Sequence, residues 1–68
     1  MDDKYNVPIK DKVLLTIPEA AAYTNIGQNR IAELLRRYDC NFVLCVGNKK
    51  LVKREAFEEY IAQTVNLP

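Results

Sequence analysis

Apolar residues recur at helical spacing in the segment from residue 28 to residue 38. They occupy positions i, i+3, i+4 and i+7, which form one stripe along a helix with a period of about 3.6 residues. The stripe consists of Ile31, Leu34, Leu35 and Tyr38. The pattern therefore predicts a helix that starts at about Gln28 and turns this stripe toward a core. The opposite side would expose polar and charged side chains, namely Asn29, Arg30, Glu33, Arg36 and Arg37, with Gln28 in the exposed first turn.

A second short helix is predicted immediately upstream. Thr16 can cap its N-terminus while the side chain of Glu19 reaches back to the Thr16 amide, which makes a capping box. Pro18 falls in the first turn, where a missing N–H group leaves no helical hydrogen bond unmade. Residues 25–27 (Asn-Ile-Gly) then break the pattern, and Gly27 either frees the interhelical turn or caps the helix that follows.

Two apolar runs, residues 42–46 and 51–52, flank the sequence Gly-Asn-Lys-Lys and predict a β-hairpin with Gly47 and Asn48 at its turn. A two-residue turn fixes the register, which pairs Val46 with Lys49, Cys45 with Lys50, Leu44 with Leu51 and Val43 with Val52. Both faces of such a hairpin are partly apolar. Phe42 and Leu44 favour a hairpin laid flat against the helices, but the pattern leaves open which face meets the core.

The two ends of the chain carry weaker patterns. Residues 1–12 are polar and lack periodicity, which predicts a mobile arm, whereas residues 13–17 predict a short strand before the first helix. A last helix is expected over residues 54–64, with a stripe made of Phe57, Tyr60, Ile61, Thr64 and Val65. Three acids near its start complement the helix dipole, namely Glu55, Glu58 and Glu59. Residues 66–68 are expected to fray.

The assembled order is strand, two helices, hairpin and helix, within one domain of residues 13–65. This order predicts an α+β fold, the small winged helix-turn-helix. The 68 residues allow a single domain with a small core. A chain of this length buries only about 60% of the surface that its unfolded form exposes.

The net charge of +1 conceals an uneven distribution. Residues 25–54 hold seven basic and two acidic side chains, a net charge of +5, whereas the rest holds three basic and seven acidic ones, a net charge of −4. A basic region of this kind favours binding to a polyanion. In the major groove arginine pairs with guanine, and asparagine or glutamine with adenine, so the polar side of the helix from Gln28 can read bases. An ordinary solvated helix face remains the alternative.

The sequence lacks the residues of the common catalytic and metal sites. It has no histidine, and two cysteines, Cys40 and Cys45, are too few for a disulfide scaffold or a zinc site. We expect semi-buried free thiols in a reduced cytoplasmic protein without metal or cofactor. No glycine-rich phosphate loop or nucleophile–base pair indicates an enzyme. No signal-peptide pattern is present, and no apolar run approaches the roughly 18 residues of a membrane span.

Three blocks of the sequence resemble the excisionases, or recombination directionality factors, of conjugative transposons and related integrative elements, within the wider excisionase and MerR-like group. The blocks are residues 15–21 (LTIPEAA), Tyr23 with residues 26–31 (IGQNRI), and residues 47–49 (GNK) with 52–54 (VKR) and 57–58 (FE). Their order and spacing carry the likeness, since no single block is diagnostic. Two positions depart from the family pattern: Thr24 stands where an apolar residue is expected between the helices, and Lys50 stands where the wing is usually apolar.

The resemblance implies a non-catalytic protein that binds double-stranded DNA near the ends of an integrated element, bends it, and biases a tyrosine-family integrase toward excision. A direct contact with the integrase is left open, and we expect a monomer in solution with several copies on the DNA. Residues 28–30 match the start of the family's recognition helix, and residues 48–49 match its wing. With the neighbouring basic residues, the expected DNA-contacting set is Gln28, Asn29, Arg30, Glu33, Arg36, Arg37, Asn48, Lys49, Lys50, Lys53 and Arg54.

Two other functions fit the same residues. A small winged-helix transcriptional regulator would present the same helix and hairpin to DNA. A protein-binding adaptor would instead pair with a partner through the exposed edge of the hairpin and would bind little DNA.

Overall fold

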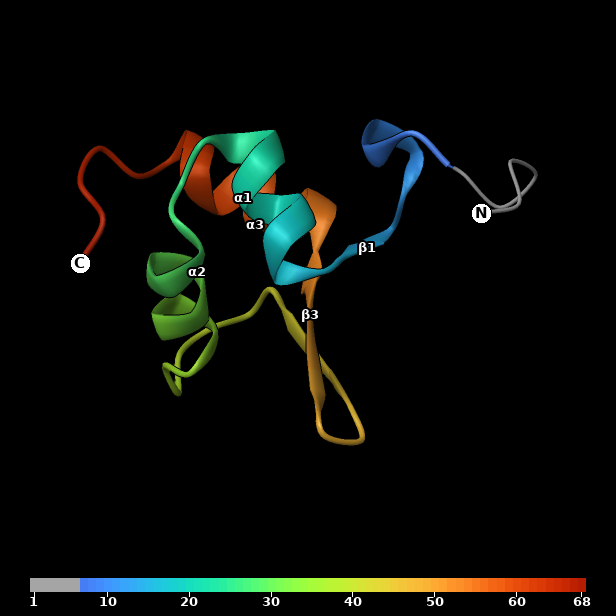
Figure 1. Cartoon of the computed structure of the whole chain (residues 1–68). Helices are drawn as coiled ribbons and strands as arrows, with labels where there is room; N and C mark the ends of the chain where they lie inside the picture. Colours follow the sequence, from blue (N-terminus) through green and yellow to red (C-terminus); the bar gives the residue numbers. More distant parts are fainter. Residues whose placement is uncertain (1–6) are drawn as a thin grey trace.

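The computed structural model describes residues 7–68, so half of the predicted N-terminal arm, residues 1–6, lies outside the described residues. The elements follow in the order η2 (Ile9–Asp11), β1 (Leu14–Leu15), α1 (Ile17–Thr24), α2 (Gln28–Leu35), β2 (Val43–Val46), β3 (Lys49–Lys53) and α3 (Arg54–Ala62). Figure 1 shows the three helices gathered above and beside a hairpin that projects away from α1 and α3. This arrangement confirms the predicted α+β winged helix-turn-helix.

The N-terminus of α1 is closed by the predicted capping box. The Thr16 amide donates to Glu19 Oε1 at 2.9 Å, and the Glu19 amide donates to Thr16 Oγ1 at 3.2 Å. Pro18 lies in the first turn, as expected. Two N–H groups that the helix itself cannot satisfy therefore have side-chain acceptors, and the start of α1 is fixed at Ile17.

The turn between α1 and α2 falls where the sequence predicts it, but its left-handed residue is Asn25, with φ 64°. Asparagine tolerates this conformation better than most residues. Gly27 takes the second of its two predicted roles, as the N-cap of α2 with φ −61°. Thr24, which departs from the family pattern, keeps its hydroxyl satisfied by donating to the Ala20 carbonyl at 2.7 Å and accepting from the Ile26 amide.

The apolar stripe of α2 enters the core as predicted for Ile31, Leu34 and Leu35, which expose 3% or less of their surface. The expectation for Tyr38 is wrong, because this side chain is fully exposed. The helix ends at Leu35, and Arg36 forms its C-cap. The chain therefore turns away before a further helical turn can bring Tyr38 back over the core.

Strands β1, β3 and β2 form an antiparallel sheet in that order, and the hairpin has the predicted register throughout. Gly47 has φ 60°, the conformation that the first loop position of a type II′ turn requires. Val52 is buried and Val43 packs against the core, so the face that carries these two valines meets the helices. The hairpin does not lie flat on them: only its base packs, while Val46 near the tip is half exposed.

A stack of aromatic rings joins the base of the hairpin to α3. The Phe42 ring lies 4.9 Å from the Phe57 ring and 5.0 Å from the Tyr60 ring, measured between centroids. Phe42 and Phe57 are both buried. Among the described residues, the buried core consists of Leu15, Ala20, Ile31, Leu34, Leu35, Phe42, Val52 and Phe57.

The chain after α3 differs from expectation in two ways. The helix ends at Ala62, so Val65 never joins its stripe and is 96% exposed. Leu67 packs against the core instead of fraying with the last residues. A single leucine thus brings the C-terminal segment back onto the domain.

The described part of the N-terminal lead-in is also attached to the domain. Ile9 packs against the core, and the Arg54 amide donates to the Val13 carbonyl at 3.0 Å. The Lys12 ammonium forms an ion pair with the Glu19 carboxylate, which lowers the pKa of that carboxyl group. The described lead-in thus contacts the rest of the domain through Ile9, Lys12 and Val13.

Replacing Thr16 with alanine removes the acceptor of the capping box. We expect Thr16→Ala to lower the free energy of unfolding by about 1 kcal/mol, measured by chemical denaturation followed by circular dichroism. Thr64→Ala is the matched control, because the Thr64 hydroxyl donates to the Tyr60 carbonyl within its own helix end and caps no N–H group. Equal losses in the two variants would show that the box adds nothing.

Candidate nucleic-acid interface

The first turn of α2 offers its polar side chains to solvent. Because Ile31, Leu34 and Leu35 are buried, the helix cannot roll about its axis, and Gln28, Asn29 and Arg30 are left exposed. Glu33 is also exposed, and its carboxylate lies 4.0 Å from the Arg30 guanidinium. The same guanidinium donates to the carbonyl oxygen of Pro68 at 2.5 Å. The predicted base-reading residues therefore share one open surface.

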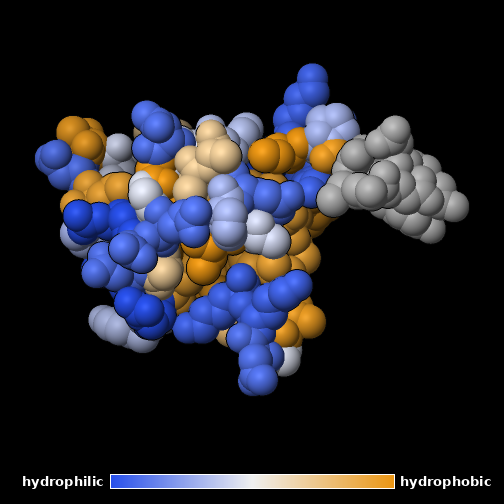
Figure 2. All heavy atoms as spheres, in the orientation of Figure 1, coloured by the Kyte–Doolittle hydropathy of each residue, from blue (hydrophilic) through white to orange (hydrophobic). Residues whose placement is uncertain are grey.

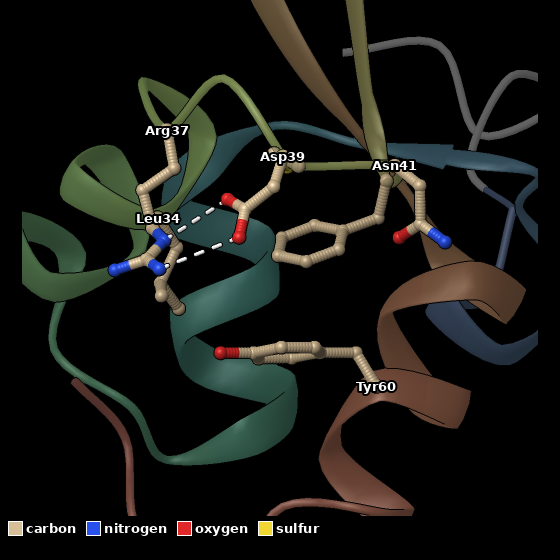
Figure 3. A pocket seen from close by; sticks show the side chains of 7 residues that line it. Leu34, Arg37, Asp39, Asn41 and Tyr60 are labelled. Carbon is tan, nitrogen blue, oxygen red and sulfur yellow. Dashed lines mark hydrogen bonds and ion pairs between the residues drawn. The ribbon is translucent and has the colours of Figure 1, made fainter.

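The last turn of α2 leads into an arginine pair with two different environments. Arg36 is exposed, whereas Arg37 donates from Nε and Nη2 to the two carboxylate oxygens of Asp39 at 3.2 and 3.4 Å (Figure 3). Their hydrogen bond raises the pKa of Arg37 and lowers the pKa of Asp39. Arg37 reaches the surface with about half of its side chain exposed, but part of its charge is already compensated.

Two hollows beside Arg37 are smaller than a typical ligand pocket. The cavity lined by Arg37, Asp39 and Tyr60 (Figure 3) measures about 120 Å³, and the hollow lined by Arg30, Glu33 and Arg37 measures about 230 Å³. Ligand pockets usually measure about 300–1,000 Å³. These two hollows therefore do not indicate a site for an organic ligand.

The hairpin carries the second group of predicted contacts. Asn48, Lys49, Lys50 and Lys53 are all exposed. Lys50 lies on the same hairpin face as Val52, whereas Lys49 and Lys53 alternate to the other face. In the view of Figure 1, α2 and the hairpin extend in the same direction away from α1 and α3, and Figure 2 shows hydrophilic residues over both. The structure therefore brings the polar helix and the lysine-tipped hairpin to one side of the molecule.

Arg54 stands apart from this set, because its side chain is only 16% exposed. Its Nε donates to the Lys12 carbonyl at 2.7 Å, and its Nη1 donates to Glu58 Oε2 at 3.2 Å. Glu58 also accepts a hydrogen bond from the Tyr23 hydroxyl. Arg54 thus ties the lead-in to α3 just after the hairpin, and its guanidinium is committed to protein acceptors.

The sequence pattern does not predict this network, because it explains Glu58 only as an acid that complements the helix dipole. Tyr23 and Glu58 are 35 residues apart, and nothing in either local sequence indicates the other. The Tyr23 hydrogen bond, followed by that of Arg54, lowers the pKa of Glu58, and the same bond raises the pKa of Tyr23. The side chains of Tyr23, Arg54 and Glu58 thus connect α1, α3 and the lead-in by hydrogen bonds.

An exposed helix face set by a buried stripe, beside a basic hairpin, defines a winged helix-turn-helix protein of the DNA-binding class. The family model described as "Helix-turn-helix domain" matches residues 14–65. The chain is also 35% identical over 57 residues to the "Excisionase from transposon Tn916" of Streptococcus agalactiae serotype V (strain ATCC BAA-611 / 2603 V/R), covering 82% of this chain and 85% of that protein. The chain belongs to this family, the DNA-binding excisionases of conjugative transposons.

No solved structure matches the chain. Within residues 7–68, none of the helices is both long and apolar enough to cross a membrane.

The lowered pKa of Glu58 makes the stability of the fold depend on pH. Glutamate in an unfolded chain has a pKa of about 4.3, so a lower pKa in the folded state stabilises the fold above that value. This stabilisation is lost as the pH falls through the folded pKa. We expect Glu58→Gln to lower the melting temperature at pH 7 and to differ little from the parent near pH 3.

The control for this comparison is Glu59→Gln on the same helix. Glu59 is exposed, and its carboxylate has no ion pair or hydrogen bond within the described part of the chain. Thermal melts at a series of pH values should therefore show nearly parallel curves for Glu59→Gln and the parent. A Glu58→Gln curve that also runs parallel would contradict the role of the network.

Proposed function

We propose that α2 enters the major groove of double-stranded DNA while the hairpin contacts the adjoining backbone or minor groove. The observation that carries this proposal is the exposed first turn of α2, held outward by the buried stripe on its other side. Gln28, Asn29, Arg30 and Glu33 would face the bases. The surrounding contacts would come from Arg36, Arg37, Asn48, Lys49, Lys50 and Lys53. Arg54 would support the wing from within, because its guanidinium is held by Lys12 and Glu58.

The side chains on α2 have the chemistry for direct readout. An amide pairs with adenine N6 and N7, a guanidinium with guanine O6 and N7, and a carboxylate accepts from cytosine N4. Gln28, Asn29, Arg30 and Glu33 supply all three kinds of group on the exposed part of one helix. The lysines of the hairpin would add affinity for phosphate without reading sequence.

We further propose that the protein acts at the ends of a mobile element in the cytoplasm and assists a tyrosine-family integrase in excision. The likeness to a transposon excisionase supports this role. The chain would supply no catalytic group and would act through the shape of the DNA. A domain of this size covers a short site, so several copies in phase along the duplex would be needed for a useful bend.

Arg30 is the sharpest test of base readout. We expect Arg30→Ala to weaken binding to a duplex selected from a random pool by about 1–3 kcal/mol and to relax base preference at one position, measured by mobility shift. Lys10→Ala is the control, because Lys10 is an exposed cation in η2, outside α2 and the hairpin. An unchanged affinity ratio between selected and scrambled duplexes would show that Arg30 only holds phosphate.

A test for DNA bending distinguishes an architectural role from binding that leaves the DNA straight. Circularly permuted fragments that carry the selected site should migrate differently on a gel when the protein is bound, because the bend moves relative to the fragment ends. Addition of the protein to integrase and an integrated substrate should then raise the yield of excised product. Uniform migration would contradict the bending role, and no duplex binding even at low salt would favour a protein-binding adaptor.

A further inference from the structure

The segment that follows α3 folds back along the domain. The Thr64 amide donates to the Ile61 carbonyl at 3.1 Å, and Leu67 then packs against the core. Leu67 lines one side of a groove of about 220 Å³, whose other lining residues are Thr24, Ile26, Ile61, Thr64 and Val65. Residues 64–68, termed here the C-terminal strap, are therefore anchored between α3 and the turn that precedes α2.

The far end of the strap reaches the surface that the proposed function assigns to DNA. The Pro68 carbonyl accepts a hydrogen bond from Arg30 Nη1, and a hollow of about 230 Å³ is lined by Arg30, Glu33, Leu34, Arg37 and Pro68. Figure 1 shows the chain after α3 descending to the level of the upper end of α2. The strap thus engages the arginine expected to read a base.

We propose that the C-terminal strap is an autoinhibitory contact that competes with DNA for Arg30. The inference rests on the proposed function of α2. Nη1, the donor bound to Pro68, is one of the two nitrogens at the end of the guanidinium. A bidentate contact to guanine through Nη1 and Nη2 needs this end free. DNA must therefore displace the end of the strap before Arg30 can pair with a base through this end. A duplex that offers Arg30 no acceptor has nothing to exchange for the lost contact.

The strap would set affinity through the fraction of molecules in which it is open. When only an open state binds, the apparent affinity falls by that fraction, and raising the open fraction raises the affinity. Leu67 is the anchor, so Leu67→Ser should favour the open state. We expect this variant to bind the selected duplex about three to ten times more tightly than the parent. A chain that ends at Val65 should show the same gain.

Two comparisons isolate the strap from general effects on the fold. Val65→Ser is the matched control, because Val65 belongs to the same segment but is 96% exposed, and it should leave affinity unchanged. In an Arg30→Ala background, Leu67→Ser should bring no gain, because the competed group is absent. Such dependence of one substitution on another is the mark of a shared contact.

Leu67 methyl resonances, followed by NMR as the selected duplex is added, report the release directly. We expect them to move toward the positions found for leucine in a flexible chain. Methyl signals that stay in place would contradict the autoinhibitory contact, and so would weaker binding by Leu67→Ser with its fold intact. In either case a loss of affinity in Arg30→Ala would still support the proposed function. Failure of the parent itself to bind any duplex would instead overturn the proposed function, and with it the inference.

Discussion

The fold depends on a small core, which among residues 7–68 holds eight buried side chains, and α2 contributes Ile31, Leu34 and Leu35 to it. A short chain has little other apolar surface to bury, so these three contacts decide how the helix is rolled. The exposed position of Gln28, Asn29 and Arg30 follows from what lies beneath them. The packing of the apolar stripe thus determines which side chains of α2 form the surface expected to meet DNA. We therefore expect a substitution in the stripe to change DNA binding as well as the stability of the fold.

The hairpin obtains its direction from two contacts at its base. Phe42 stacks on α3, and Val52 enters the core beside Leu15 of the neighbouring strand. Beyond these residues the strands are held mainly by their own ladder. Arg54, at the junction of β3 and α3, then links that junction to the lead-in through the Lys12 carbonyl. A basic side chain near the surface expected to meet DNA thus binds groups of the protein itself.

Features encoded within a few residues could be predicted from the sequence. Thr16 and Glu19 specify the capping box, and Gly47 with Asn48 specifies a turn whose length fixes four strand pairs. Helix ends were less predictable, because the apolar periodicity continues to Tyr38 and Val65 whereas α2 ends at Leu35 and α3 ends at Ala62. Contacts between distant segments were beyond local patterns, as the partners of Arg54 and the anchorage of Leu67 show.

The candidate interface likewise has features that could be predicted from the sequence and features that could not. The angular position of Gln28, Asn29 and Arg30 on α2 could be predicted, because it follows from the spacing of the apolar stripe. The pairing of Arg37 with Asp39 and the hydrogen bond from Arg30 to the Pro68 carbonyl could not, because composition does not show which groups these arginines contact. The number of basic residues in a sequence therefore overstates the number that a surface leaves without a protein partner.

The turn at the tip of the hairpin limits variation at one position and permits it at others. A side chain at position 47 would collide with nothing within 4 Å, so its restriction is one of backbone torsion alone. The residues around it are exposed and are not part of the buried core, namely Val46, Asn48, Lys49 and Lys50. Substitutions at these four positions could therefore change the chemistry of the loop while its turn is kept, provided that Gly47 is retained.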